Sequence, residues 1–312
     1  MAVNIMADSA ANLRQSATPW HQSTAIGYVV LAMVVMVWAG FALTMRAIGA
    51  SPLAPADVAM IRFAVPLILL LPFTFRRLNQ LRKVVPKDAL LVLLGGVPFF
   101  FIASEGARTT SAAYVGALIA GTTPVAVAIL LWCFERWSTP RRQWLPLGLI
   151  ILGAGGMVVG QPQPVTSETM HGVAFLLVAS LVWGAYTIGL KRTGVDAIAN
   201  GLLISTGSLI VLVVMIAFGL VKSNFGHFTF ADTLPFLLVQ GVGVGLLSTV
   251  GYAFAISRLG AAKSSTIGSL APAVATLLAI PLLGETQSLA TFFSIAIITA
   301  GVVLSSRRSQ KG

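Results

Sequence analysis

The sequence predicts an all-α integral membrane protein whose ten transmembrane helices form two inverted five-helix repeats. Three observations lead to this fold class: the composition, ten apolar segments of spanning length, and landmarks that recur in the same order in both halves of the chain. Of the 312 residues, 57% are hydrophobic and only 9% are charged. One soluble core could not cover so much apolar surface, so we expect a lipid bilayer to surround the chain.

Ten apolar segments have the length that a membrane-spanning helix requires, which is roughly 20 residues. They lie at residues 25–45, 57–75, 89–108, 111–133, 143–160, 171–191, 198–220, 233–257, 262–283 and 287–306. The polar start of the chain lacks the apolar core and cleavage site of a signal peptide, so the first segment is expected to be the first anchor. The predicted order is a cytoplasmic tail at 1–24, a first repeat at 25–160, a periplasmic linker at 161–170, a second repeat at 171–306 and a cytoplasmic tail at 307–312.

The repeat is visible in landmarks that recur in order. Trp38-Ala39-Gly40-Phe41 reaches Arg46 eight residues after the tryptophan, and Trp183-Gly184-Ala185-Tyr186 reaches Lys191 at the same distance. Later in each half, an arginine leads into a Gly/Ala-rich segment with a proline inside it and a glutamate beyond it: Arg108, Pro124 and Glu135, then Arg258, Pro272 and Glu285. Because five is odd, the second copy crosses the bilayer upside down. Inverted repeats of this kind are typical of secondary transporters, whose site lies between the repeats near the midplane.

The basic residues predict the orientation. If the N-terminus is inside, sixteen of the 20 Lys and Arg residues lie in cytoplasmic segments, and only Arg46, Arg108 and Lys222 lie on the other side. This bias predicts that both termini of the multi-pass chain face the cytoplasm. The net charge of +11 is then a topogenic signal, and we expect no binding of nucleic acid.

The residues that catalysis would need are scarce. The sequence has no G-x-x-x-x-G-K-[ST] loop for ATP, and its three histidines lie outside the helices or at their edges. The five aspartates are scattered singly, so neither a metal cluster nor a paired-carboxylate centre can be assembled. We therefore expect no enzyme activity, no catalytic residues, no metal and no cofactor. The single cysteine, Cys133, excludes an intramolecular disulfide.

Aromatic residues and helix-breaking residues at membrane depth are the candidates for a substrate site. Two tryptophans occupy matching places in the bodies of their helices, each followed by a second aromatic residue, and interfacial anchoring does not explain them. Two prolines, in matching helices, each free the carbonyl four residues earlier, beside small hydroxyl residues. The predicted cavity residues are Trp38, Phe41, Phe101, Thr123, Pro124, Trp183, Tyr186, Tyr252, Ser269 and Pro272. Helix packing is the alternative for the aromatic residues, and a structural kink is the alternative for the prolines.

Two ionisable residues at depth are candidates for a gate, because charge inside a bilayer is expensive. Arg62 lies about two turns from the outer end of the second helix, where it either extends outward to the interface or closes an outer gate. Glu105 lies about one turn from the outer end of the third helix, and the alternative is a local ion pair with Arg108. Neither position matches a proton relay at the midplane, so strong proton coupling is not expected.

Together these residues carry a family resemblance. The ten helices in two repeats, the Trp38-Ala39-Gly40-Phe41 opening, the Ile61-Arg62-Phe63 stretch, the two proline helices and the glutamates Glu135 and Glu285 resemble the EamA family of the drug/metabolite transporter superfamily. Within it the chain is similar to YddG-type inner-membrane exporters. Phe134-Glu135 departs from Gly284-Glu285 at the matching place in the second half.

The resemblance implies efflux of aromatic and other neutral amino acids and of some cationic drugs. The leading interpretation is thus a secondary transporter that exports amino acids by alternating access through a largely uncharged cavity. A multidrug or metabolite exchanger of the same superfamily is the alternative within transport. A membrane scaffold or receptor without transport is the alternative from another class, and a pocket at Trp38 and Trp183 would separate the two classes.

Overall fold

The computed structural model describes residues 24–136, 139–160 and 166–309, and all regular structure in these ranges is helical. Residues 1–23 of the predicted N-terminal tail, residues 161–165 of the linker and residues 310–312 of the C-terminal tail lie outside the described residues. Ten helices are long and apolar enough to cross a membrane, as predicted. They span residues 24–50, 55–81, 86–108, 112–134, 141–159, 167–193, 197–217, 230–259, 263–283 and 289–306.

The first five spans are built from seven α-helices, α2 to α8, and short 3-10 turns. In order they are α2 (Thr24–Ala47) with η2 (Ile48–Ala50); α3 (Pro55–Leu70), η3 (Leu71–Phe73) and α4 (Thr74–Leu81); α5 (Pro86–Leu94) and α6 (Val97–Arg108); α7 (Ala112–Glu135); and η4 (Arg141–Gln143) with α8 (Trp144–Val159). The second span is longer than predicted, because the polar helix α4 continues beyond the apolar stretch.

The second five spans contain two interruptions. They are α9 (Ser167–Thr193); α10 (Ala197–Ala217); α11 (Phe230–Phe236), η5 (Leu237–Leu247) and α12 (Ser248–Leu259); α13 (Ala261–Gly268) and α14 (Ala271–Leu283); and α15 (Leu289–Ser309). The segment η5 is π-helical, a geometry that is rare and frequently found at functional sites. Between α13 and α14 the helix breaks, and Pro272 lies in the first turn of α14.

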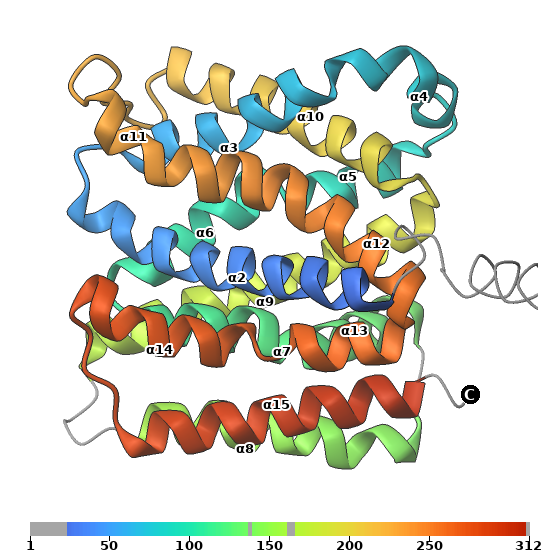
Figure 1. Ribbon diagram of the computed structural model, residues 1–312, viewed down its shortest axis with the longest axis vertical. Coiled ribbons are helices and arrows are strands. Elements are labelled where there is room, and N and C mark those ends of the chain that lie inside the picture. Colours follow the sequence, from blue (N-terminus) through green and yellow to red (C-terminus); the bar gives the residue numbers. More distant parts are fainter. Residues whose placement is uncertain (1–23, 137–138, 161–165, 310–312) are drawn as a thin grey trace, which may run out of the picture.

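The two ends of the bundle can be told apart by the chain termini. The described chain begins and ends at the same end of the bundle, on the right in Figure 1, which we call the terminal face; the other end is the opposite face. The helices α8 and α15 pair along one edge, and α3 and α10 lie at the other, with α2, α7 and α9 between them (Figure 1).

The first helix of each repeat packs mainly against the other repeat. The helix α2 contacts α12, η5 and α14, whereas α9 contacts α5, α6 and α7. The two repeats are therefore interleaved, and the residues of α2 and α9 that share a height can meet near the middle of the bundle.

Burial is distributed differently along the two central helices α2 and α7. In α2, Ala39 and Ala42 are buried toward the opposite face, and Leu31 is buried in the other half. In α7, residues 112–115 and 117–119 are buried, whereas residues 129, 132 and 134 are exposed. The buried residues of α7 are thus concentrated toward the opposite face.

Candidate functional site

Four aromatic rings from both repeats form the centre of the candidate site. The ring centroids of Phe41 and Phe99 are 6.0 Å apart, those of Phe99 and Trp183 4.8 Å, and those of Trp183 and Tyr186 4.7 Å. We call Phe41, Phe99, Trp183 and Tyr186 the aromatic cluster. It joins α2, α6 and α9, because the interleaved packing brings the first helix of each repeat onto α6.

Phe99 was not among the predicted site residues, whereas its neighbour Phe101 was. Phe101 instead meets the edge of Phe100, with ring centroids 5.9 Å apart. Three consecutive phenylalanines point in three directions around a helix, and the sequence offers no signal that selects one of them.

Trp38 and Tyr252 form a separate pair, with ring centroids 5.0 Å apart. The Trp38 ring lies on Gly268 at the end of α13, where an added Cβ would come within 2.9 Å of the ring. Tyr186 lies in the same way on Gly95 at the end of α5, where an added Cβ would come within 2.6 Å. Each repeat therefore places an aromatic ring over a glycine at which a helix of the other repeat breaks.

The predicted proline regions differ from one another. Pro124 lies inside the continuous helix α7, and the Thr123 hydroxyl donates to the Ile119 carbonyl at 2.8 Å. Pro272 is buried at a helix break, and its Cα is 3.3 Å from a Cβ added at Gly116. The hydroxyl of Ser269 donates to its own helix, at Thr266, over 2.7 Å. These hydroxyls satisfy local backbone, and none of the hydrogen bonds found among the described residues links them to the aromatic cluster.

Arg62 is buried among neutral partners and does not extend outward. Its Nη1 donates to Gln240 Oε1 at 2.6 Å, and its Cζ lies 5.2 Å from the Phe41 ring centroid and 5.9 Å from that of Phe100. Gln240 lies in the π-helical segment η5 and is fully buried. Its Nε2 donates to the Thr44 hydroxyl at 2.8 Å, so the three side chains connect α3, η5 and α2.

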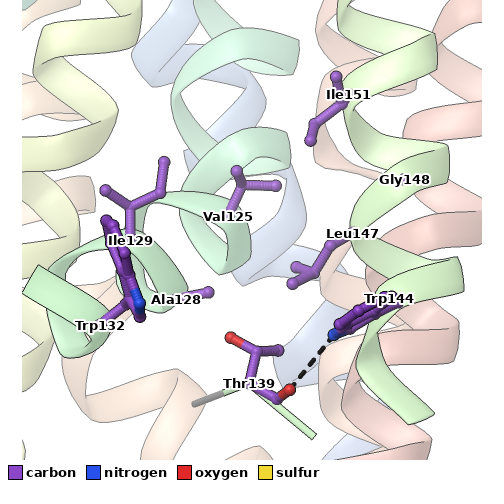
Figure 2. Close-up of a pocket in the computed structure, with 9 residues that line it drawn as sticks. All are labelled: Val125, Ala128, Ile129, Trp132, Thr139, Trp144, Leu147, Gly148 and Ile151. Carbon is purple, nitrogen blue, oxygen red and sulfur yellow. Dashed lines mark hydrogen bonds between the residues drawn. The ribbon is translucent and has the colours of Figure 1, made fainter. Parts of the chain in front are cut away.

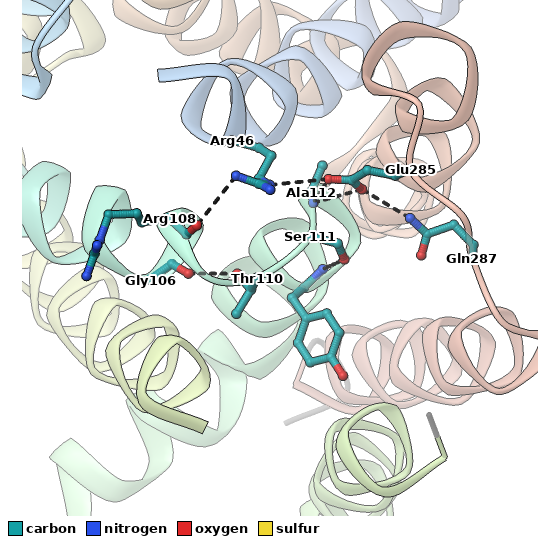
Figure 3. Close-up of polar contacts among 9 residues, drawn as sticks. Arg46, Gly106, Arg108, Thr110, Ser111, Ala112, Glu285 and Gln287 are labelled. Carbon is teal, nitrogen blue, oxygen red and sulfur yellow. Dashed lines mark hydrogen bonds and ion pairs between the residues drawn. The ribbon is translucent and has the colours of Figure 1, made fainter. Parts of the chain in front are cut away.

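The polar contacts at the opposite face centre on Glu285, which we did not select as a site residue (Figure 3). The Ala112 amide donates to both carboxylate oxygens, at 3.0 and 3.1 Å, and Gln287 Nε2 donates to Oε2 at 3.1 Å. Arg46 Nε is 3.6 Å from Oε1, and Arg46 Nη1 donates to the Arg108 carbonyl at 3.5 Å. We call these contacts the opposite-face seal; they tie α2 and α7 of the first repeat to the end of α14.

Burial raises the pKa of Glu285, and this effect outweighs the Ala112 amide, Arg46 and Gln287, which all favour the charged form. Glu105, the other predicted gate residue, does not join the seal. It forms the local ion pair with Arg108, at 2.8 Å, with both side chains largely exposed.

Two aspartates hold α3 and α10 together, one at each face. At the opposite face, Asp57 at the start of α3 accepts hydrogen bonds from the Ser223 hydroxyl and, at 2.9 Å, from the Asn224 amide. At the terminal face, Asp196 at the start of α10 pairs with Arg77 Nε at 2.6 Å and accepts from Gln80 Nε2 at 3.0 Å. We call these the Asp57 clasp and the Asp196 clasp. Burial opposes ionisation of Asp196, but the Ala199 amide, Gln80 and Arg77 together hold its pKa below the ordinary value.

An apolar groove of about 470 Å³ lies between α7 and α8 near the terminal face (Figure 2). Trp132 and Trp144 flank it, and the Trp144 indole donates to the Thr139 carbonyl at 3.2 Å. The lining is almost entirely hydrocarbon, and both tryptophans are 66% exposed, as expected for a surface that faces lipid. Within the described ranges, no three His, Cys, Asp or Glu residues are grouped as metal ligands.

Comparison with known proteins agrees with this architecture. The chain is 25% identical, over 269 residues, to a protein of Clostridium kluyveri named "Uncharacterized transporter", and the match covers 82% of this chain and 85% of the relative. A solved structure titled "Crystal structure of protein" has the same fold, with a TM-score of 0.61 at 14% identity over 93% of this chain and 98% of the other. The EamA-like transporter family model matches twice, at residues 25–159 and 170–307. With both halves of the ten-helix chain matched, the protein belongs to the EamA-like transporter family.

Proposed function

We propose that this chain is a secondary transporter that exports aromatic and other neutral amino acids, and also cationic drugs, by alternating access. Membership of a transporter family and the ten-helix fold support transport of a small molecule across a bilayer. The observation that carries the substrate class is the aromatic cluster, which is built from both repeats in the middle of the bundle.

Two features support alternating access with the terminal face open. The seal around Glu285 ties α2 and α7 to the end of α14 at the opposite face, and the buried residues of α7 are concentrated toward that face. Because the first helix of each repeat packs on the other repeat, a rigid-body movement of one repeat would change both faces together.

We place the terminal face in the cytoplasm of a bacterial cell, at the inner membrane. Sixteen basic residues belong to that side and three to the other, which is the bias that orients inner-membrane proteins. In this orientation the Glu285 seal closes the periplasmic face, and substrate would enter from the cytoplasm, as export requires. Labelling of engineered cysteines within 76–88 by a membrane-impermeant reagent from the periplasm would contradict it.

The test of substrate class is counterflow in proteoliposomes. Vesicles loaded with unlabelled phenylalanine should accumulate labelled phenylalanine transiently. The accumulation should persist when an ionophore collapses the pH gradient, because none of the carboxylates and histidines whose side chains the structure describes lies at the midplane. Counterflow of a cationic drug or another metabolite without amino acids would favour the exchanger of the same superfamily. Absence of counterflow for every compound would favour a scaffold.

The test of the site is Trp183→Ala, with Trp144→Ala as the matched control. Trp183 contacts two rings of the aromatic cluster, whereas Trp144 lies at the lipid-facing groove. Aromatic contacts contribute about 0.5–1.5 kcal/mol beyond burial, so Trp183→Ala should lower counterflow of phenylalanine relative to alanine by about twofold to tenfold. The control should preserve the ratio. If Trp183→Ala and Trp38→Ala both transport normally, the tryptophans are packing residues.

A further inference from the structure

Arg62 carries a positive charge that the protein leaves unbalanced. Of the Lys and Arg residues whose side chains the structure describes, Arg62 alone is buried, with 6% of its surface exposed. It lies seven residues from the first residue of α3, about 10 Å along the helix from the opposite-face end. The four ion pairs found among the described residues use other side chains, and no carboxylate pairs with Arg62.

The partners of Arg62 orient the guanidinium without neutralising it. The Thr44 hydroxyl donates to the Gly40 carbonyl at 2.8 Å, so it accepts from Gln240 Nε2, and this leaves Gln240 Oε1 turned toward Arg62. An amide oxygen uses one of the five N–H donors of a guanidinium and supplies no net charge. The rings of Phe41 and Phe100 attract the cation only weakly. The guanidinium of Arg62 is therefore held in one orientation, and its positive charge is not neutralised by an acidic side chain.

An arginine inside a bilayer normally pairs with an acid or faces a water-filled path. A guanidinium with free donors matches a carboxylate in shape and charge, and the pair is strong where water is scarce. One of the two rings at Arg62, Phe41, also belongs to the aromatic cluster. A molecule with its carboxylate on Arg62 would therefore place an apolar side chain against Phe41 and the neighbouring Phe99.

We propose that Arg62 is the receptor for the carboxylate of the transported molecule, and that transport selects monocarboxylates with an apolar side chain. This inference rests on the proposed function for the place of the site, and it narrows the substrate class. Amino acids satisfy it. Amines that lack a carboxylate do not, so cationic drugs would bind to the aromatic rings alone and more weakly.

The experiment compares three ligands that share one ring: phenylalanine, 3-phenylpropionate, which lacks the ammonium group, and phenethylamine, which lacks the carboxylate. The readout is the ligand concentration that stabilises the purified full-length protein against thermal unfolding in detergent. Wild-type protein should respond to both carboxylates at about tenfold to hundredfold lower concentration than to phenethylamine, the range of a charge-assisted hydrogen-bonded pair.

Arg62→Gln should remove this difference by weakening both carboxylates about tenfold to hundredfold, while the response to phenethylamine stays within about twofold. Arg62→Lys should keep part of the preference, because charge remains and the planar donor pair is lost. Arg258→Gln is the matched control: Arg258 also lies over a phenylalanine, Phe254, at 5.1 Å, but near the terminal end of α12. It should retain the wild-type order of ligands.

Each outcome decides between the two proposals. Equal responses of wild-type protein to phenylalanine and phenethylamine would overturn the role of Arg62 and leave amino-acid export standing. A response to 3-phenylpropionate without one to phenylalanine would support Arg62 as a carboxylate receptor and overturn amino-acid export. Stabilisation by chloride that requires Arg62, with no effect of carboxylates, would assign the site to an inorganic anion and overturn the inference. No response to any ligand would count against both. The wild-type comparison decides even if Arg62→Gln does not fold.

Discussion

The two faces of the bundle hold their acidic residues in different ways. At the opposite face, the Glu285 side chain is 13% exposed and joins the ends of three helices. At the terminal face, the Asp196 side chain is 38% exposed and joins α10 to α4. The pKa of the first is raised by burial, and the pKa of the second is lowered because its hydrogen bonds and Arg77 outweigh burial. The carboxylate of the Glu285 seal is thus less hydrated than that of the Asp196 clasp.

The aspartate clasps show what the two faces still share. Asp57 and Asp196 lie at the starts of corresponding helices, α3 and α10, and each binds the segment that follows the other helix: Asn224 after α10, and α4 after α3. The packing of α3 on α10 is therefore held at both faces, while the seal around Glu285 lies at the opposite face. This difference indicates that the opposite face would change by breaking the Glu285 seal, with α3 and α10 remaining together.

The largest expected effect comes from Glu285→Ala. The variant removes the carboxylate that accepts from the buried Ala112 amide, and an unsatisfied buried donor costs about 1–3 kcal/mol. Glu285→Gln should cost far less at neutral pH, because its amide oxygen can still accept from Ala112 and burial disfavours the charge that it loses. Thermal unfolding of both variants in detergent measures the difference.

Thiol labelling of introduced cysteines, in a Cys133→Ala background, tests whether loss of the Glu285 seal loosens only the opposite face. A cysteine placed at residue 112 should react faster with a membrane-impermeant thiol reagent when Glu285→Ala is present, because the opposite face loosens. A cysteine at Gly194, near the terminal face, is the control and should not change. Equal stability of the Ala and Gln variants would show that the Ala112 contact does not hold this face.

The next largest effect is on the pH dependence of stability, to which Glu285 and Asp196 should contribute with opposite sign. A raised carboxyl pKa means that the folded protein binds the proton more tightly, so the Glu285 contribution is greatest below the ordinary value of 4.5 and is lost as the pH rises through the raised pKa. A lowered pKa has the reverse effect, so the Asp196 contribution is present above 3.8 and is lost as the pH falls below it.

Unfolding temperatures measured from about pH 7 to about pH 3 separate the two contributions. Glu285→Gln leaves the Asp196 contribution, so this variant should lose stability on acidification. Asp196→Asn leaves the Glu285 contribution, so this variant should gain stability on acidification. Comparison with wild-type protein under the same conditions cancels the titration of the other acids. Identical pH dependences of the unfolding temperature for the two variants would contradict the opposite pKa shifts of Glu285 and Asp196.

The sequence predicted the ten spans because apolar length alone determines them, but it could not predict the shape of the proline helices. Pro124 and Pro272 occupy matching places in the repeats, yet α7 is continuous and the other helix breaks. Around Pro272 the chain has a glycine four residues before, with the Trp38 ring packed on it. That contact comes from the other repeat, so local sequence does not contain it.

The residues of the candidate site could likewise be predicted only in part from the sequence. Trp183, Tyr186 and Phe41 were predicted from the repeat, and the structure brings them together through Phe99. Gln240, which accepts from Arg62, lies 178 residues away in the chain, within the π-helical segment η5. A buried glutamine inside an apolar run was the available signal, because buried polar side chains are nearly always hydrogen-bonded.

The smallest expected effect is at Glu105, which the sequence offered as a gate residue and which lies at the same face as the Glu285 seal. Glu105 pairs with Arg108 one turn away, with exposed fractions of 41% and 65%, and exposed pairs of this kind contribute about 0–1 kcal/mol. Glu105→Gln should therefore shift the unfolding temperature less than Glu285→Ala does, and the shift should vanish at high salt. Counterflow should remain at the wild-type rate. A loss of counterflow without a loss of stability would mean that Glu105 acts in transport, and the gate at this face would then include it together with Glu285.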